Sequence, residues 1–308
     1  MISLVFPGQG SQYIGMGKDF SNAFPIANDV YKEVDDVLGF SLSKLIFNGH
    51  IEDLTLTKNA QPAIMATSIA ILRTMQKEGF NTKKTMFFAG HSLGEYTALC
   101  ASGAIGLADT AHILKMRGIF MQEAVSGEEG AMAAILGLNL DKVESLVAEI
   151  KGNEICEIAN DNEPNQLVLS GHRTAIEKAC EKAKFLGAKR AILLPVSAPF
   201  HCSLMAPAQE NMINLISGLN IEKPNVPLIS NVTSIPTQDI EEIRKNLINQ
   251  ITGRVRWRES ILFMKKSGIK IIYEIGPGRV LCNLIKRIVD DVEQENISKV
   301  EDLFKLGN

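Results

Sequence analysis

The clearest chemical feature of the chain is a serine between two glycines. Residues 90–94 read GHSLG, a match to G-x-S-x-G, and they separate an apolar run at Thr85–Ala89 from a helical pattern that begins at Glu95. A tight strand-to-helix turn of this form leaves no room for side chains beside the serine and raises its hydroxyl to the sheet edge. We therefore predict that Ser92 is a nucleophile and that the Leu93 amide, at the helix N-terminus, stabilises an oxyanion.

A serine hydroxyl is a poor nucleophile until a base accepts its proton, so a histidine is expected elsewhere in the chain. His201 ends a proline-stiffened loop (residues 195–201, PVSAPFH) after a predicted strand, and loops of this kind position catalytic groups. It also follows the serine in chain order, as in α/β-hydrolases. The residues favour it over the four other histidines, His50, His91, His112 and His172.

A glycine-rich loop near the N-terminus is the next candidate. Residues 7–12 read PGQGSQ and follow an apolar run at Ile2–Phe6. The loop lacks the third glycine of a dinucleotide fingerprint, and no Gly-Lys-Ser/Thr follows to make a phosphate loop. We expect it to bring a second backbone amide close to the serine.

Arg117 lies in the middle of a predicted helix among apolar residues. One alternative is an exposed arginine whose stem covers apolar surface. The other is that its planar guanidinium group binds a substrate carboxylate through two hydrogen bonds.

The order of predicted elements indicates how these groups are held. Residues 131–194 follow the pattern βαββαβ, which is typical of a ferredoxin-like unit, with strands at Ala131–Leu138, Ile155–Asn160, Gln166–Ser170 and Arg190–Leu194 and helices at Asp141–Lys151 and Thr174–Leu186. Elsewhere strands and helices alternate, which predicts an α/β fold with a mostly parallel sheet. One of these helices is expected to open at Pro62, because proline suits the first helical position. We place the core at residues 1–127 and 196–308 and the small subdomain at 128–195.

Composition narrows the class of protein. Apolar residues make up 45% and charged residues 22% of the 308, as in ordinary globular enzymes. The net charge is −3 and the basic residues are scattered, so the sequence shows no basic patch of the kind that binds nucleic acid. No signal peptide and no apolar stretch of the ~20 residues that span a bilayer are visible, so we expect a cytoplasmic protein without membrane contact.

Five widely spaced cysteines predict reduced thiols and neither disulfides nor a zinc site. Cys202 follows His201 directly, but we expect it to be a spectator, because a free cysteine usually behaves as a small core hydrophobe.

Six motifs together resemble the malonyl-CoA:acyl carrier protein transacylases of bacterial fatty acid synthesis, over nearly the whole chain. They are FPGQGSQ (6–12), QPA (61–63), GHSLGEY (90–96), MRG (116–118), APFH (198–201) and EIGPG (274–278). The resemblance implies an α/β-hydrolase-like core with a ferredoxin-like small subdomain.

The resemblance also implies roles. Ser92 would be the nucleophile and His201 the base, Gln9 and Leu93 would supply oxyanion amides, and Arg117 would hold the malonyl carboxylate. The family orients its histidine with a backbone carbonyl, which falls at Gln250, although residues 252–255 (TGRV) differ from the asparagine and proline that many relatives show there. Phenylalanine before the histidine, as at position 200, resembles malonyl-selective members.

The implied activity is transfer of malonyl from malonyl-CoA to the phosphopantetheine thiol of acyl carrier protein through a malonyl-serine, for fatty acid elongation. Neither a metal nor a cofactor is expected, because malonyl-CoA and the carrier are substrates, and we expect a monomer. Two alternatives stay open. One is a serine hydrolase such as a thioesterase, and the other is a non-catalytic module that docks to a carrier protein or a larger synthase.

Overall fold

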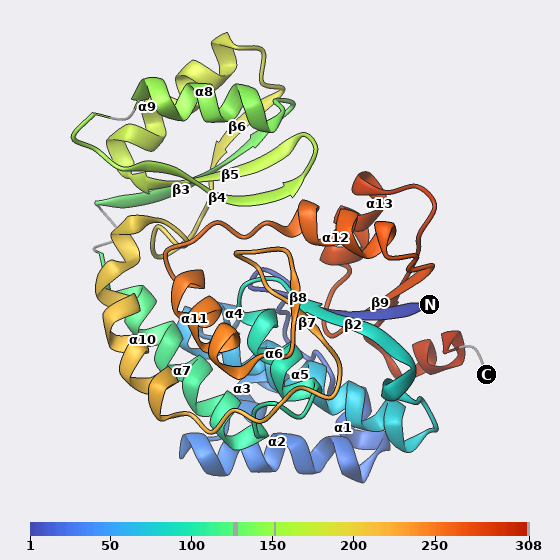
Figure 1. The fold of residues 1–308 in the computed structure, drawn as a ribbon. Coiled ribbons are helices and arrows are strands. Elements are labelled where there is room, and N and C mark those ends of the chain that lie inside the picture. The colour runs from blue at the N-terminus through green and yellow to red at the C-terminus, as the bar shows by residue number, and fades with distance from the viewer. Residues whose placement is uncertain (126–128, 151, 307–308) are drawn as a thin grey trace.

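A six-stranded sheet forms the centre of the larger part of the molecule (Figure 1). The computed structural model describes residues 1–125, 129–150 and 152–306. The strands lie in the order β10-β9-β1-β2-β7-β8, and all neighbours are parallel except β7 and β8. Their bounds are β1 Ile2–Phe6, β2 Thr85–Gly90, β7 Leu228–Ile229, β8 Pro236–Thr237, β9 Ile271–Ile275 and β10 Glu293–Ile297.

Two apolar layers cover this sheet, because alternate residues of a strand point to opposite faces. Leu4 and Phe6 of β1 pack into the larger layer, whereas Val5 packs into the smaller one. The larger layer is built with α1 Lys18–Ala23, α2 Pro25–Leu38, α3 Leu42–Asn48, α4 Ile51–Thr55, α5 Thr57–Lys77, α6 Leu93–Ala101, α7 Leu107–Glu123, α10 Ala206–Gly218 and α11 Ile240–Gln250. The smaller layer contains α12 Trp257–Lys266 and α13 Val280–Ile288.

The second sheet is antiparallel and has its own core. Its strands lie in the order β4-β5-β3-β6, and they are β3 Gly130–Leu136, β4 Cys156–Glu163, β5 Gln166–His172 and β6 Arg190–Leu193. The helices α8 Leu140–Ile150 and α9 Arg173–Phe185 pack on the face that lies away from the larger part (Figure 1). The predicted βαββαβ order and the α/β fold class are therefore confirmed.

The other face of the small sheet looks toward the larger part. Met132 and Val168 pack there with Phe200, which directly precedes His201. Strand β4 is also tied to the core by the main chain, because the Val255 amide donates to Ala159 O at 2.8 Å and the Asp161 amide donates to Val255 O at 2.9 Å. The loop that carries His201 is thus packed between the two sheets.

The start of α5 differs from the prediction. The helix begins at Thr57 and Pro62 lies inside it, although proline has no N–H to donate to the carbonyl of Lys58. Nearly every side chain from Thr57 to Met75 is buried, and this burial outweighs one missing hydrogen bond. The position of proline alone therefore gave the wrong helix start.

The predicted limits of the two subdomains stay predictions. The limit at 127/128, like Lys151 at the end of a predicted helix, lies outside the described residues. Strand β7 is short and spans only Leu228–Ile229. The helices α1, α3, α4 and α10 and the strands β8 and β10 were not predicted.

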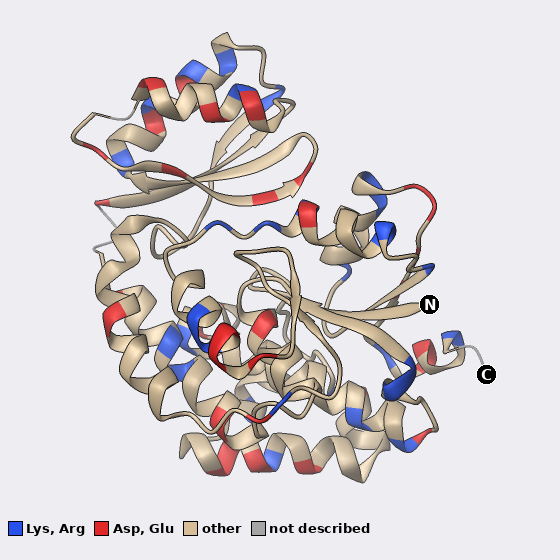
Figure 2. Cartoon of the chain, in the orientation of Figure 1, with Lys and Arg blue, Asp and Glu red and all other residues tan. Residues whose placement is uncertain are grey.

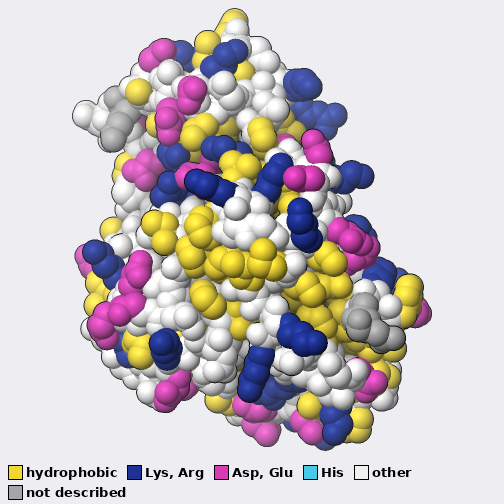
Figure 3. Space-filling view, turned by 45° about the vertical axis from the view of Figure 1, so that its right-hand side comes forward, with side chains coloured by type: hydrophobic (Ala, Val, Ile, Leu, Met, Phe, Trp, Pro, Cys, Tyr) yellow, Lys and Arg dark blue, Asp and Glu magenta, His cyan; other side chains and the backbone are white. Residues whose placement is uncertain are grey.

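The surface carries mixed charge. Lysine and arginine are interspersed with aspartate and glutamate over both parts of the molecule (Figure 2). On the face shown in Figure 3, apolar side chains gather across the middle of the molecule with basic side chains at their border. Within the described ranges, no helix has both the length and the apolar character that a bilayer crossing needs.

Candidate active site

Ser92 sits at the turn between β2 and α6, in a backbone conformation that is unusual for a residue with a side chain. Its φ is 54° and its ψ is −112°. The two glycines of the motif are required by packing. A Cβ on Gly90 would overlap the carbonyl group of Gly94, and a Cβ on Gly94 would overlap the carbonyl oxygen of Phe6. The sequence therefore forms this sharp turn only with glycine at both positions.

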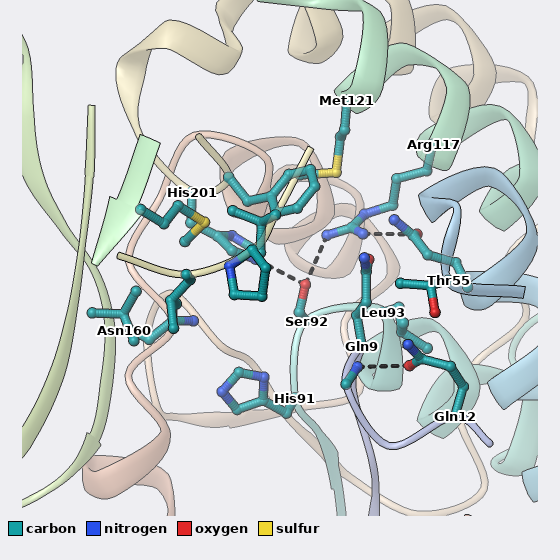
Figure 4. Close-up of a pocket in the computed structure, with 18 residues that line it drawn as sticks. Gln9, Gln12, Thr55, His91, Ser92, Leu93, Arg117, Met121, Asn160 and His201 are labelled. Carbon is teal, nitrogen blue, oxygen red and sulfur yellow. Dashed lines mark hydrogen bonds between the residues drawn. The ribbon is translucent and has the colours of Figure 1, made fainter. Parts of the chain in front are cut away.

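His201 lies against the serine hydroxyl. Its Nε2 is 2.8 Å from Ser92 Oγ (Figure 4). Its Nδ1 is 2.9 Å from the carbonyl oxygen of Gln250. Gln250 is the last residue of α11, and the last carbonyls of a helix have no intrahelical donor. When Nδ1 carries the ring proton and donates it to this carbonyl, Nε2 is free to accept the proton of the hydroxyl.

Burial keeps this imidazole neutral. His201 is only 4% exposed, and burial, assisted by the charge of Arg117, lowers its pKa from 6.5 to about 3. A neutral ring at physiological pH is the form that can act as a base. The departure of residues 252–255 from the family pattern leaves the contact with the Gln250 carbonyl in place.

Two of the other histidines have other partners. His91 lines a cavity that also contains Ser92 and His201. Its Nε2 lies 2.8 Å from Asn162 Oδ1, and its ring stands edge-on to Trp257. His172 accepts a hydrogen bond from the Ile155 amide. Within the described part of the chain, His201 is the one histidine that contacts the serine hydroxyl.

Arg117 is buried, so the exposed-arginine alternative is wrong. The side chain comes from α7 and is 1% exposed. Its Nη2 donates to Ser92 Oγ at 3.1 Å and to Gln250 Oε1 at 2.9 Å, and its Nη1 donates to Gln61 Oε1 at 2.8 Å. The guanidinium also lies 5.4 Å from the centre of the Tyr96 ring. A permanent positive charge therefore lies beside the serine hydroxyl.

The two predicted oxyanion donors line the same cavity as the serine. Leu93 is the first residue of α6, and the first N–H groups of a helix have no intrahelical acceptor. The loop that carries Gln9 lies close to the sharp turn at residues 90–94, called the elbow below. A Cβ on Gly8 would lie only 2.7 Å from His91 O in this turn. The Gln9 side chain donates to Thr57 Oγ1 at 3.3 Å.

The cavity lies between the two sheets and has a volume of about 420 Å³. Ser92, His201, Arg117 and Phe200 are among the residues that line it. The small subdomain contributes Met132, Asn160 and Val168 from three of its strands. A molecule that reaches Ser92 through this cavity therefore lies between the two parts of the chain.

Sequence reasoning missed Asn231, which braces the elbow. Its Oδ1 accepts from the Ser92 amide at 2.8 Å and its Nδ2 donates to Gly90 O at 2.6 Å. The signal was present, since a polar residue after an apolar run lies at the carboxyl edge of a parallel sheet, where the serine also lies. Gln61 stood within a recognised motif, but no role was assigned to it.

Neither a metal cluster nor a reactive thiol is found in the part of the chain that the structure describes. No group of three or more metal-binding side chains occurs within those residues, and all five cysteines are free. Cys202 is buried and donates to Pro199 O, and burial raises its pKa to about 11. It is therefore a protonated thiol at neutral pH.

Together with the fold, this geometry defines an α/β acyltransferase. A model described as an acyl transferase domain matches residues 3–302. The chain belongs to the family of malonyl-CoA:acyl carrier protein transacylases, as the six motifs predicted.

Three relatives illustrate the similarity. A curated malonyl CoA-acyl carrier protein transacylase from Bacillus subtilis (strain 168) is 45% identical over 93% of this chain and 90% of its own length. The crystal structure of an acyl-carrier-protein-S-malonyltransferase from Bartonella henselae has 48% identity and a TM-score of 0.97, covering 99% of this chain and 97% of its own. A malonyl-transacylase solved in complex with its type II PKS acyl-carrier protein has 39% identity and a TM-score of 0.96, with coverages of 99% and 98%.

Proposed function

We propose that this protein transfers the malonyl group from malonyl-CoA to the phosphopantetheine thiol of acyl carrier protein and so supplies fatty acid chain elongation. One observation carries the proposal. Ser92 Oγ lies 2.8 Å from a neutral histidine nitrogen and 3.1 Å from a buried guanidinium. A nucleophile, its base and a cation for a free carboxylate therefore meet at one atom.

In the first half-reaction Ser92 attacks the thioester carbon. His201 Nε2 takes the hydroxyl proton as the new C–O bond forms, and the carbonyl oxygen becomes an oxyanion bound by the amides of Gln9 and Leu93. The C–S bond then breaks and the CoA sulfur leaves with the proton from His201. A malonyl ester on Ser92 remains.

The second half-reaction is the reverse with a different thiol. The phosphopantetheine thiol gives its proton to His201 as its sulfur attacks the ester carbon, and the same two amides stabilise the tetrahedral intermediate. The bond to Ser92 Oγ breaks, and the oxygen recovers a proton from His201. The enzyme returns to its starting state with malonyl on the carrier.

Arg117 supplies the substrate preference. Three covalent bonds of about 1.5 Å separate Ser92 Oγ from the carboxyl carbon of a bound malonyl group. A guanidinium nitrogen 3.1 Å from that Oγ is thus within reach of the carboxylate. An acetyl group would leave the buried cation without this partner, which is unfavourable. Phe200 lines the cavity and restricts space for a branched acyl group.

The relatives support the substrates. The curated relative from Bacillus subtilis is named for malonyl-CoA and acyl carrier protein, and one similar structure holds a carrier protein. Both half-reactions use side chains and backbone amides of the chain alone, with CoA and the carrier as substrates. We propose a cytoplasmic location, because five free cysteines suit a reducing compartment.

Product analysis with labelled malonyl-CoA tests the proposal. With phosphopantetheinylated carrier protein, we expect label on the carrier and little free malonate. Carrier protein without the phosphopantetheine group is the matched control and should receive no label. Rapid malonate release without carrier labelling would instead show a hydrolase, and absence of any turnover would show a binding module.

A further inference from the structure

Glu95 is a buried carboxylate that the proposed mechanism does not use. It lies in the first turn of α6, three residues after Ser92, and is 1% exposed. A helix N-terminus favours a negative charge at this position. Its Oε2 accepts a hydrogen bond from Gln250 Nε2 at 2.7 Å and one from the Asn231 amide at 3.2 Å.

The Gln250 side chain connects this carboxylate to Arg117. Its Nε2 donates to Glu95 Oε2 at 2.7 Å and to Ser92 O at 2.9 Å, whereas its Oε1 accepts from Arg117 Nη2 at 2.9 Å. Burial raises the pKa of Glu95 from 4.5 to about 7, and hydrogen bonds from Gln250 and Asn231 oppose this rise, so the carboxylate is mainly ionised above about pH 7. An ionised carboxylate only accepts hydrogen bonds, and an amide has one donating and one accepting end. Glu95 therefore directs the amide nitrogen toward itself and the amide oxygen toward the guanidinium.

The orientation of this amide decides where the guanidinium lies. If the amide were reversed, its NH₂ group would face Arg117 Nη2, and two donors would meet in a buried site. Such a contact is costly because neither group has water as an alternative partner. Burial lowers the pKa of Arg117, and the negative charge of Glu95 opposes that effect. The amide orientation, and the negative charge of Glu95 in its ionised form, together hold a charged guanidinium next to Ser92 Oγ.

We propose that Glu95 is a specificity-determining positioning residue, which acts through the side chain of Gln250 to hold Arg117 beside Ser92 for acyl groups that carry a carboxylate. This inference rests on the proposed malonyl transfer. Glu95 touches neither the acyl group nor the reacting atoms in this arrangement. Its effect should therefore fall on the choice of acyl group.

A purely structural role for Glu95 predicts a different result. The carboxylate also contacts the Asn231 amide, and the Asn231 side chain braces the elbow through Ser92 N and Gly90 O. Loss of that brace would displace Ser92 Oγ for every substrate. Acylation by malonyl-CoA and by acetyl-CoA would then fall by the same factor.

The test is acylation of Glu95→Gln by malonyl-CoA and acetyl-CoA, measured as kcat/KM for each. Gln has the shape of Glu but can also present NH₂ to Gln250, which releases the amide orientation. We expect the malonyl-to-acetyl ratio to fall about tenfold or more, mainly through a higher KM for malonyl-CoA. Asn231→Ala is the matched control, with both substrates slowed alike. An unchanged ratio in Glu95→Gln would overturn the inference.

A double-mutant comparison isolates the route through Arg117. In an Arg117→Ala background, Glu95→Gln should leave the remaining malonyl-to-acetyl ratio unchanged, because the guanidinium is gone. A further fall there would contradict a route through Arg117. If Glu95→Gln does not fold, Glu95→Asp keeps the charge but withdraws it from Gln250, and we expect the same direction of change. Failure of wild-type enzyme to load malonyl would refute the proposed function itself, which separates the two outcomes.

Discussion

Ser92 and His201 stand 109 positions apart in the chain, yet they share a 2.8 Å hydrogen bond and both hold a left-handed backbone, with φ of 54° and 59°. A non-glycine residue in such a conformation costs roughly 1–3 kcal/mol, which the surrounding structure must offset. The two side chains that meet at the proposed reaction centre are thus held there against local backbone preference.

Relief of this strain can be measured at Ser92. Glycine adopts positive φ freely, whereas alanine retains the strain of the native residue. We expect Ser92→Gly to have a free energy of unfolding about 1 kcal/mol above that of Ser92→Ala, although neither is active. Urea unfolding of both variants gives the comparison. An alanine variant at least as stable as the glycine variant would show that the turn is not strained.

Loss of the guanidinium should change the choice of acyl group. In Arg117→Ala, kcat/KM for malonyl-CoA should fall by about 100-fold, because a charged hydrogen bond to the carboxylate is lost in a buried site. Acetyl-CoA, which has no carboxylate, should lose far less or gain. Steady-state kinetics with both thioesters tests this, with Arg117→Lys as the variant that keeps the charge. An equal fall in kcat/KM for both thioesters would contradict the proposed role of Arg117 in binding the carboxylate.

A methyl group at Gly94 should damage the elbow. The added Cβ would overlap the carbonyl oxygen of Phe6, so β1 and α6 must separate. We expect Gly94→Ala to lose about 2 kcal/mol of unfolding free energy or more and most of its activity. Gly218→Ala is the control, because a Cβ there meets no atom within 4 Å. Thermal melts of both variants decide the matter, and equal melting temperatures would contradict the packing argument.

Stability should depend on pH through His201. Burial lowers its folded-state pKa from 6.5 to about 3, so between these values the unfolded chain binds more protons than the folded one. This contribution to the unfolding free energy is complete above pH 6.5 and falls by up to about 1.4 kcal/mol per unit as the pH drops through the window. The His201→Asn variant lacks the titrating group, so the gap between it and the native protein should change with pH. A gap that stays constant from pH 7 to pH 4.5 would be inconsistent with a neutral buried imidazole.

The sequence predicted the elements whose signals are local. The strand at Ile2–Phe6 is a short apolar run, and its observed bounds match the prediction. The βαββαβ unit follows from alternating patterns, and Ser92 follows from a turn that needs two glycines. In contrast, β10 (EQENI) is a partly exposed edge strand without an apolar run, so no local pattern marked it.

The parts that could not be predicted depend on distant contacts. Burial of Arg117 was left open, because its helix neighbours are apolar under either alternative and its partners Gln61 and Gln250 are 56 and 133 positions away. The contact between Glu95 and Gln250 spans 155 positions. Such pairs are created by the topology of the sheet, and a single sequence carries no separate signal for them.

The most direct measurement is intact-protein mass spectrometry after brief exposure to malonyl-CoA. Wild-type protein should gain the mass of one malonyl group, located on Ser92 by peptide mapping, and the adduct should disappear when phosphopantetheinylated carrier protein is added. Ser92→Ala should gain no mass. A malonyl adduct that persists on Ser92→Ala, or carrier loading by that variant at the wild-type rate, would contradict the account.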